Sequence, residues 1–163
     1  MDRTIYRSQR LKEGDLMADL MGNVAPILLP ALVLVLWSMI MLGWMAVTRL
    51  SYLAGQDVGP EAGQRTQDLG DQMPKEIQWK ADNYNHLFEQ PTAFYATAII
   101  LAMIGLGNEA LYLYAAWGYV GLRIIHSLVH VTTNIVMVRF GLFVLSSLCL
   151  IVMAAGGALT LMD

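Results

Sequence analysis

The chain has 163 residues, of which 56% are hydrophobic and only 14% are charged, whereas a soluble domain carries roughly 25% charged residues. A domain of this size cannot bury so much apolar surface, so lipid must surround much of the chain. The net charge of −3 excludes the basic face that a nucleic-acid-binding protein needs. The single cysteine, Cys149, excludes a disulfide within the chain and a cysteine metal cluster.

Apolar segments long enough to cross a bilayer recur along the chain, since a membrane-spanning helix needs about 20 residues. They cover residues 24–47, 90–108, 110–138 and 140–162. Only Glu109 separates the second from the third, and Arg139 separates the third from the fourth. Connections this short force neighbouring helices to run antiparallel. We therefore predict an all-α integral membrane protein, a four-transmembrane-helix up-and-down bundle that forms a single domain over residues 1–163.

One sizeable polar region, residues 48–89, separates the first two apolar segments. Its first half carries glycine and proline turn signals. Its second half, from Lys75 onward, has a helical pattern. We expect that helix to extend the second span beyond the bilayer.

The third apolar segment carries a polar stripe. At 100° per residue, its polar side chains fall within about 60° of one line along the helix, and they are Arg123, His126, Ser127, His130 and Asn134. A charge near the middle of a span costs about 2.5–3.5 kcal/mol on insertion scales. Arg123 must therefore face the bundle interior or a wet cavity, which makes it a candidate functional residue.

A second stripe precedes the second apolar segment. Asp82, Asn85, His86 and Glu89 follow the spacing i, i+3, i+4 and i+7, which is one helical face. Since the second and third helices run antiparallel, the two stripes lie level with each other. We expect Glu89 or Asp82 to be the counter-ion of Arg123 or of a protonated His126, with Arg139 at the same rim.

Other interpretations of these stripes remain open. Arg123 with a carboxylate could be a purely structural ion pair, or the stripe could be a proton or ion path. The stripe before the second segment could also be a solvated helix face. His126 and His130 have the spacing of a two-histidine metal site, but His86 is the only other histidine and there is no H-E-x-x-H motif, so we expect no metal.

The same residues carry a resemblance to a known family. The third segment reads Arg123-Ile-Ile-His126-Ser127-Leu-Val-His130, which is similar to an Arg-x-x-His-Ser/Thr-x-x-Tyr motif. Arg139 follows nine residues later, and the stretch that leads into the second segment reads Asn85-His-Leu-Phe-Glu89-Gln-Pro91. Together with the arrangement of apolar segments, these motifs resemble the MAPEG family, the membrane-associated proteins in eicosanoid and glutathione metabolism, in a bacterial branch.

This resemblance implies a homotrimer in the lipid bilayer, here a bacterial inner membrane, that uses glutathione as a co-substrate near the cytoplasmic face. A small hydrophobic electrophile would reach the site from the bilayer, and the activity would be that of a transferase or peroxidase. The resemblance assigns thiolate stabilisation to Arg139. The residues it implies for glutathione binding are Arg49, Asn85, Glu89, Arg123, His126 and His130.

The chain also departs from the family pattern. His130 stands where family enzymes have a tyrosine, and Phe140 stands where one branch has a serine. These departures favour an alternative function, a non-catalytic membrane protein that keeps the fold and binds lipid or a protein partner.

Overall fold

The computed structural model describes residues 25–56, 70 and 72–162, and within these residues it contains helices and turns but no strand. This confirms the predicted all-helical class. The elements are α2 (Leu28–Leu53), α4 (Lys75–His86), α5 (Gln90–Met103), the short 3-10 helix η1 (Leu106–Asn108), α6 (Ala110–Thr132) and α7 (Val136–Met162).

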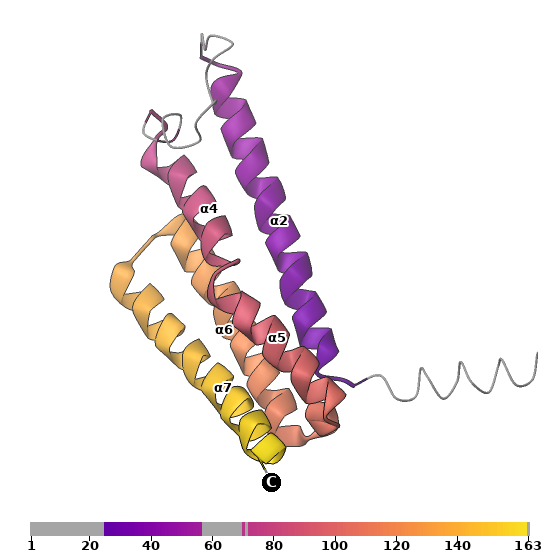
Figure 1. The fold of residues 1–163 in the computed structure, drawn as a ribbon. Helices are drawn as coiled ribbons and strands as arrows, with labels where there is room; N and C mark the ends of the chain where they lie inside the picture. The colour runs from indigo at the N-terminus through magenta and orange to yellow at the C-terminus, as the bar shows by residue number, and fades with distance from the viewer. Residues whose placement is uncertain (1–24, 57–69, 71, 163) are drawn as a thin grey trace, which may run out of the picture.

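The helices form an up-and-down bundle (Figure 1). The chain rises through α2, returns through α4 and α5, rises again through α6 and descends through α7. Large apolar side chains from these helices fill the interior, among them Leu34, Met41, Phe94, Leu101 and Met153. Between helices that lie in lipid, close van der Waals packing of such side chains, together with hydrogen bonds between helices, holds the bundle together.

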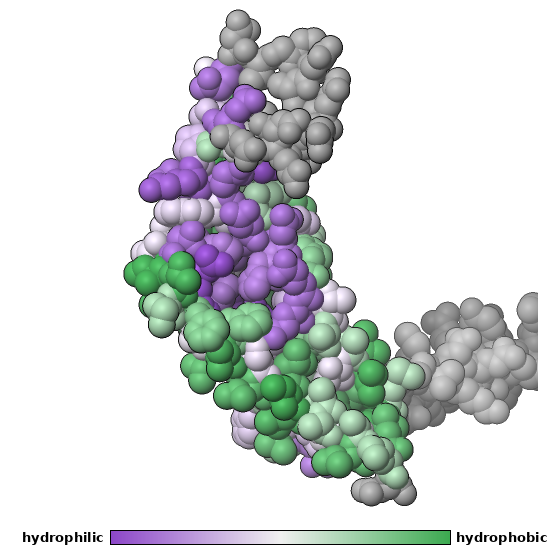
Figure 2. Space-filling model, turned by 60° about the vertical axis from the view of Figure 1, so that its left-hand side comes forward, coloured by the Kyte–Doolittle hydropathy of each residue, from purple (hydrophilic) through white to green (hydrophobic). Residues whose placement is uncertain are grey.

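Among the helices of the described residues, α2 and α7 are long and apolar enough to cross a membrane. Their outer faces expose large aliphatic side chains, including Leu32, Leu36, Leu148 and Ile151. Hydrophilic residues gather at the end of the molecule where α4 lies, while hydrophobic residues cover the other end (Figure 2). An apolar exterior of this extent would aggregate in water, so the solvent of these outer faces is lipid.

The second predicted span differs from the structure at its end. Residues 90–108 were expected to be one helix, but α5 ends at Met103 and η1 follows. Gly105 lies between them with φ 82°, in the left-handed region that favours glycine. The connection to α6 is therefore longer than Glu109 alone.

The expected extension of the second span is also interrupted. Helix α4 ends at His86 and α5 begins at Gln90, with a turn between them. Pro91 explains the break, because a proline inside a helix lacks an N–H donor and its ring clashes with the carbonyl four residues earlier, here that of Leu87. The polar region 48–89 is thus helical at both ends, through α2 to Leu53 and through α4 from Lys75, and its middle lies outside the described residues.

The boundary between the third and fourth helices lies before Arg139 rather than at it. Helix α6 ends at Thr132, and Asn134 has φ 52°, a conformation that asparagine tolerates better than most residues. The Asn134 N–H donates to the carbonyl of Val129 at 2.7 Å and closes the end of α6. Arg139 therefore belongs to the first turns of α7 instead of the connection.

Replacing Gly107 with alanine is expected to destabilise the protein by about 2 kcal/mol and to lower its apparent Tm. A Cβ atom at this position would lie 2.6 Å from the Cβ of Ala25 and 3.2 Å from the backbone of Ala102. The Gly121→Ala variant is the matched control, because no atom lies within 4 Å of its Cβ position. Thermal unfolding in detergent measures both, and equal Tm values for the two variants would refute the close approach.

Candidate functional site

Arg123 is the centre of the polar interior. Helix α6 turns Tyr119, Arg123, His126, Ser127 and His130 inward, which confirms that its polar stripe faces the bundle. Arg123 is only 1% exposed, and its guanidinium lies between the rings of Tyr119 and Phe143, 5.3 and 5.2 Å from their centroids. Cation–π contacts of this kind partly replace the hydration that the buried cation loses.

The hydrogen bonds of Arg123 are incomplete within the described residues. Its Nη1 lies 3.2 Å from Nε2 of His86, whereas its Nε and Nη2 are buried without a hydrogen-bond partner there. Buried polar groups are nearly always paired, and a buried charge without a partner is more costly still. Among the described residues, Arg123 is thus a buried cation whose Nε and Nη2 donors are available to bind another group.

The expected counter-ion does not contact Arg123 directly. Within the described part of the chain, the carboxylate of Glu89 instead contacts His86, with Nδ1 of His86 2.8 Å from Oε2 of Glu89. Glu89 follows the end of α4, so it does not continue that helical face but turns back to His86 three residues earlier. Asp82 is exposed. Glu89 therefore reaches Arg123 only through His86, and the direct ion pair expected from the sequence is wrong.

The three histidines form a cluster beside Arg123. The ring of His86 lies 5.0 Å from that of His126 and 6.3 Å from that of His130, centroid to centroid. The rings of His126 and His130 are 5.9 Å apart, and His130 Nδ1 is buried without a partner in the described chain. No group of potential ligands among the described residues is arranged to hold a metal ion.

A cavity of about 220 Å³ opens beside this cluster. Its walls come from α4, α6 and α7, and they are His86, His126, Val136, Arg139, Phe140 and Phe143. The Nη1 of Arg139 donates to the side-chain oxygen of Asn134, while its Nε is buried and unpartnered in the described region. The cavity thus combines a guanidinium and imidazoles with aromatic and aliphatic walls.

Not all of the predicted site residues meet at this cavity. His126 and Arg139 line it, whereas Arg123 and His130 do not, although Arg123 contacts the wall residue His86 and the ring of His130 lies close to that of His126. Arg49 is instead held on α2 by a hydrogen bond of 3.2 Å from its Nη2 to Oε1 of Gln78 on α4. Asn85 is exposed on α4 and does not line the cavity.

The structure also brings in residues that the sequence analysis did not select. His86 contacts both Arg123 and Glu89, whereas helical spacing had placed it only within a stripe. Asn83 is fully buried, and its amide donates to Oγ of Ser127 at 2.7 Å. Leu87 is apolar and lies one helical turn after Asn83, so the two residues share a helical face. That spacing was the sequence signal that Asn83, rather than Asn85, faces the interior.

The interior beyond Arg123 is aromatic. Phe94 of α5 stacks on Tyr119 with ring centroids 4.3 Å apart, and both side chains are fully buried. A conducting pore would need water or polar groups along its whole length. This stacked pair places an apolar layer next to Arg123, and the geometry does not favour the ion path.

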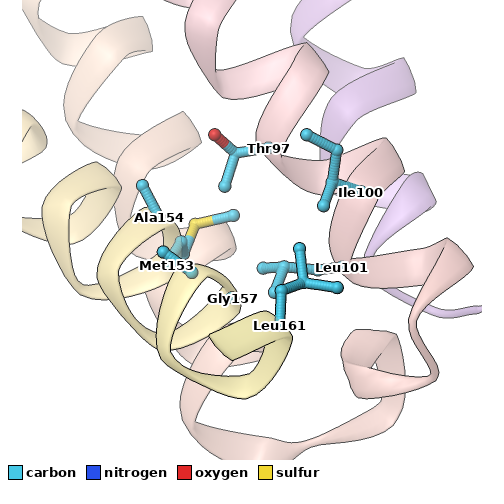
Figure 3. A pocket seen from close by; sticks show the side chains of 8 residues that line it. Thr97, Ile100, Leu101, Met153, Ala154, Gly157 and Leu161 are labelled. Carbon is cyan, nitrogen blue, oxygen red and sulfur yellow. The ribbon is translucent and has the colours of Figure 1, made fainter. Parts of the chain in front are cut away.

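A second cavity, of about 180 Å³, lies between α5 and α7 and is lined by Thr97, Ile100, Leu101, Met153, Ala154, Gly157, Ala158 and Leu161 (Figure 3). Its walls are almost entirely apolar. Met153 follows Arg139 by fourteen residues on α7, which corresponds to roughly 21 Å along a helix. This cavity is therefore separate from the one that Arg139 lines.

The fold and the site define a helical membrane protein with a buried guanidinium and a cationic, imidazole-lined cavity near one end of the bundle. The model of the MAPEG family matches residues 27–159, which is most of the chain. The protein therefore belongs to the MAPEG family, and the resemblance found in its sequence motifs is confirmed. Comparison with curated proteins and with solved structures gives no match.

Proposed function

We propose that this protein is a membrane-bound, glutathione-dependent transferase or peroxidase that acts on small hydrophobic electrophiles. The observation that carries the proposal is Arg123, a buried guanidinium with Nε and Nη2 unpartnered and no carboxylate in contact among the described residues. A buried cation is stable only when an anion or several acceptors complete its site. An anionic ligand supplies that missing partner.

Glutathione fits this donor set because it carries two carboxylates, one ammonium group and one thiol. Guanidinium groups bind carboxylates through paired, charge-assisted hydrogen bonds. Arg123 holds one carboxylate, and Arg49, at the α2–α4 contact, is the candidate for the other. Glu89 is 67% exposed at the aqueous end of the site and accepts from the ammonium group, with Asn85 beside it on the surface.

Arg139 is the residue that we assign to the thiol. Bound glutathione supplies a sulfur that, as a thiolate, attacks an electrophilic carbon or reduces a peroxide. A neighbouring cation favours the thiolate over the thiol, and Arg139 lines the cavity while its Nε has no hydrogen-bond partner among the described residues. His126 and His130 complete the polar wall as hydrogen-bonding groups.

The remaining parts of the proposal concern assembly and membrane topology. In this proposal α2, α5, α6 and α7 all cross a bacterial inner membrane, and the chain forms a homotrimer. Arg49 and Asn85 do not line the cavity of their own chain, so their predicted ligand contacts are best explained by a site that continues across a subunit boundary. The hydrophobic substrate reaches the cavity from the bilayer past Val136 and Phe140, which are exposed apolar residues of α7.

The alternative is a non-catalytic protein that binds lipid or a protein partner. It is favoured by Phe140, a cavity wall residue that is 61% exposed and apolar, and by His130 at the position of the family's tyrosine.

Titrating glutathione into the detergent-solubilised protein at neutral pH separates the two functions. We expect a saturable thiolate absorbance together with an increase in Tm, because a ligand that binds only the folded state stabilises it. S-methylglutathione is the matched control ligand, since it keeps the carboxylates but has no free thiol. It should raise the Tm without the absorbance. If a folded protein gives neither signal with glutathione, the lipid- or partner-binding alternative replaces this proposal.

A further inference from the structure

His86 connects the buried Arg123 to the exposed Glu89. Its Nε2 lies 3.2 Å from Nη1 of Arg123, and its Nδ1 lies 2.8 Å from Oε2 of Glu89. A guanidinium has donors but no acceptor, so Nε2 must accept the hydrogen bond from Arg123. The ring proton is then on Nδ1, where it is donated to Glu89. These contacts define a neutral imidazole in a single tautomer.

The tautomer has a consequence for the charge at Arg123. A carboxylate in direct contact would hold the guanidinium but also offset its positive charge. A neutral imidazole holds one edge of the guanidinium and leaves its charge uncompensated. The Nε and Nη2 donors stay unpartnered in the described chain. Such a cation is suited to an anionic group of a ligand.

We propose that His86, oriented by Glu89, is the positioning residue for Arg123 and presents its uncompensated guanidinium to a carboxylate of the bound ligand. This inference rests on the proposed function, in which that ligand is glutathione. His86 acts through Arg123, and Glu89 acts through His86 with one carboxylate oxygen. The second oxygen of Glu89 is left for the ammonium group of the ligand.

Two substitutions at His86 distinguish positioning from simple space filling. In His86→Gln, the amide oxygen can accept from Arg123 and the amide nitrogen can donate to Glu89. In His86→Leu, the side chain has neither group. A hydrogen bond to a charged group is worth enough to change affinity about tenfold or more. We expect His86→Leu to raise the Kd for glutathione at least about tenfold, and His86→Gln to stay within about threefold of the native value.

The affinities are measured by calorimetry on the full chain in detergent, with the Tm of each variant recorded to show that it is folded. Glu76→Gln is the matched control, since it neutralises an exposed carboxylate in the first turn of the same helix α4 outside the site, and it should bind glutathione like the native chain. Equal Kd values for the two folded His86 variants would overturn the positioning role.

Nitrogen-15 NMR of the imidazole tests the inference without any ligand. The His86 signals are assigned by their absence in His86→Gln, and we expect Nδ1 to be protonated and Nε2 to be an acceptor. A proton on Nε2 would overturn the inference. If the expected tautomer is observed but native protein binds no glutathione, the positioning pair is supported and glutathione is removed as its ligand. Failure of the proposed function is then distinguishable from failure of this inference.

Discussion

Replacing Arg139 with alanine is expected to abolish the saturable thiolate absorbance of bound glutathione at neutral pH. A free thiol has a pKa near 8.5, and lowering it by about 2 units requires roughly 2.7 kcal/mol of preferential thiolate stabilisation. In the described structure, Arg139 is the cation that lines the cavity, which makes it the best-placed cation for this role. The ratio of thiolate to thiol should fall by about 100-fold, which at pH 7 lowers the thiolate fraction by about 25-fold. The Kd should change far less, because the carboxylates are held elsewhere.

The control for this experiment is a cation outside the site. Lys75 begins α4 and is exposed, so Lys75→Ala removes the same formal charge without touching the cavity and should leave the absorbance intact. Arg139 also contacts Asn134 in the α6–α7 connection, and the Tm of Arg139→Ala shows whether that contact matters for folding. A folded Arg139→Ala variant that still produced the native absorbance would assign thiolate stabilisation to another residue.

Replacing Arg123 with methionine is expected to remove glutathione binding and, at the same time, to stabilise the ligand-free protein. Arg123 is almost fully buried, with donors unpartnered within the described residues. Exchange of buried ionic groups for apolar side chains of similar size is often neutral or stabilising by 1–4 kcal/mol. The loss of paired hydrogen bonds to a carboxylate should weaken glutathione binding by about 100-fold or more.

Calorimetry measures the affinity of Arg123→Met, and thermal unfolding in detergent measures its stability. Opposite changes in the two quantities are characteristic of a residue kept for function at a cost in stability. A large fall in Tm with unchanged affinity would instead support a purely structural role, in which Arg123 holds the helices in register.

Hydropathy and periodicity were sufficient to predict the helical class and the membrane environment. Apolar segments without charge have few structural alternatives, because only a bilayer can solvate them. The inward orientation of Arg123, His126 and His130 also followed from sequence, since residues three and four apart lie on one helical face. The same motif led to the MAPEG family, which the match over residues 27–159 confirms.

The ends of the helices were not predictable in the same way. The apolar character of the chain continues past Met103 and past Thr132, so hydropathy places no boundary there. The left-handed conformations of Gly105 and Asn134 end these helices, and they depend on the local backbone and its hydrogen bonds. As a result, Arg139 moved from a predicted connection into α7, where it lines the cavity.

Only the tertiary structure decided which side chains meet in the site. Helical spacing predicts that Asp82, His86 and Glu89 share a stripe, but it predicts neither the end of α4 before Glu89 nor how α4 is rotated against α6. That rotation results from packing between the helices, with Asn83 bonded to Ser127. It brings His86 between Arg123 and Glu89, so that a neutral imidazole, rather than a carboxylate, contacts the buried guanidinium. The sequence by itself determined the membrane fold, the family and the inward stripe, whereas contacts between helices determined the partners of Arg123.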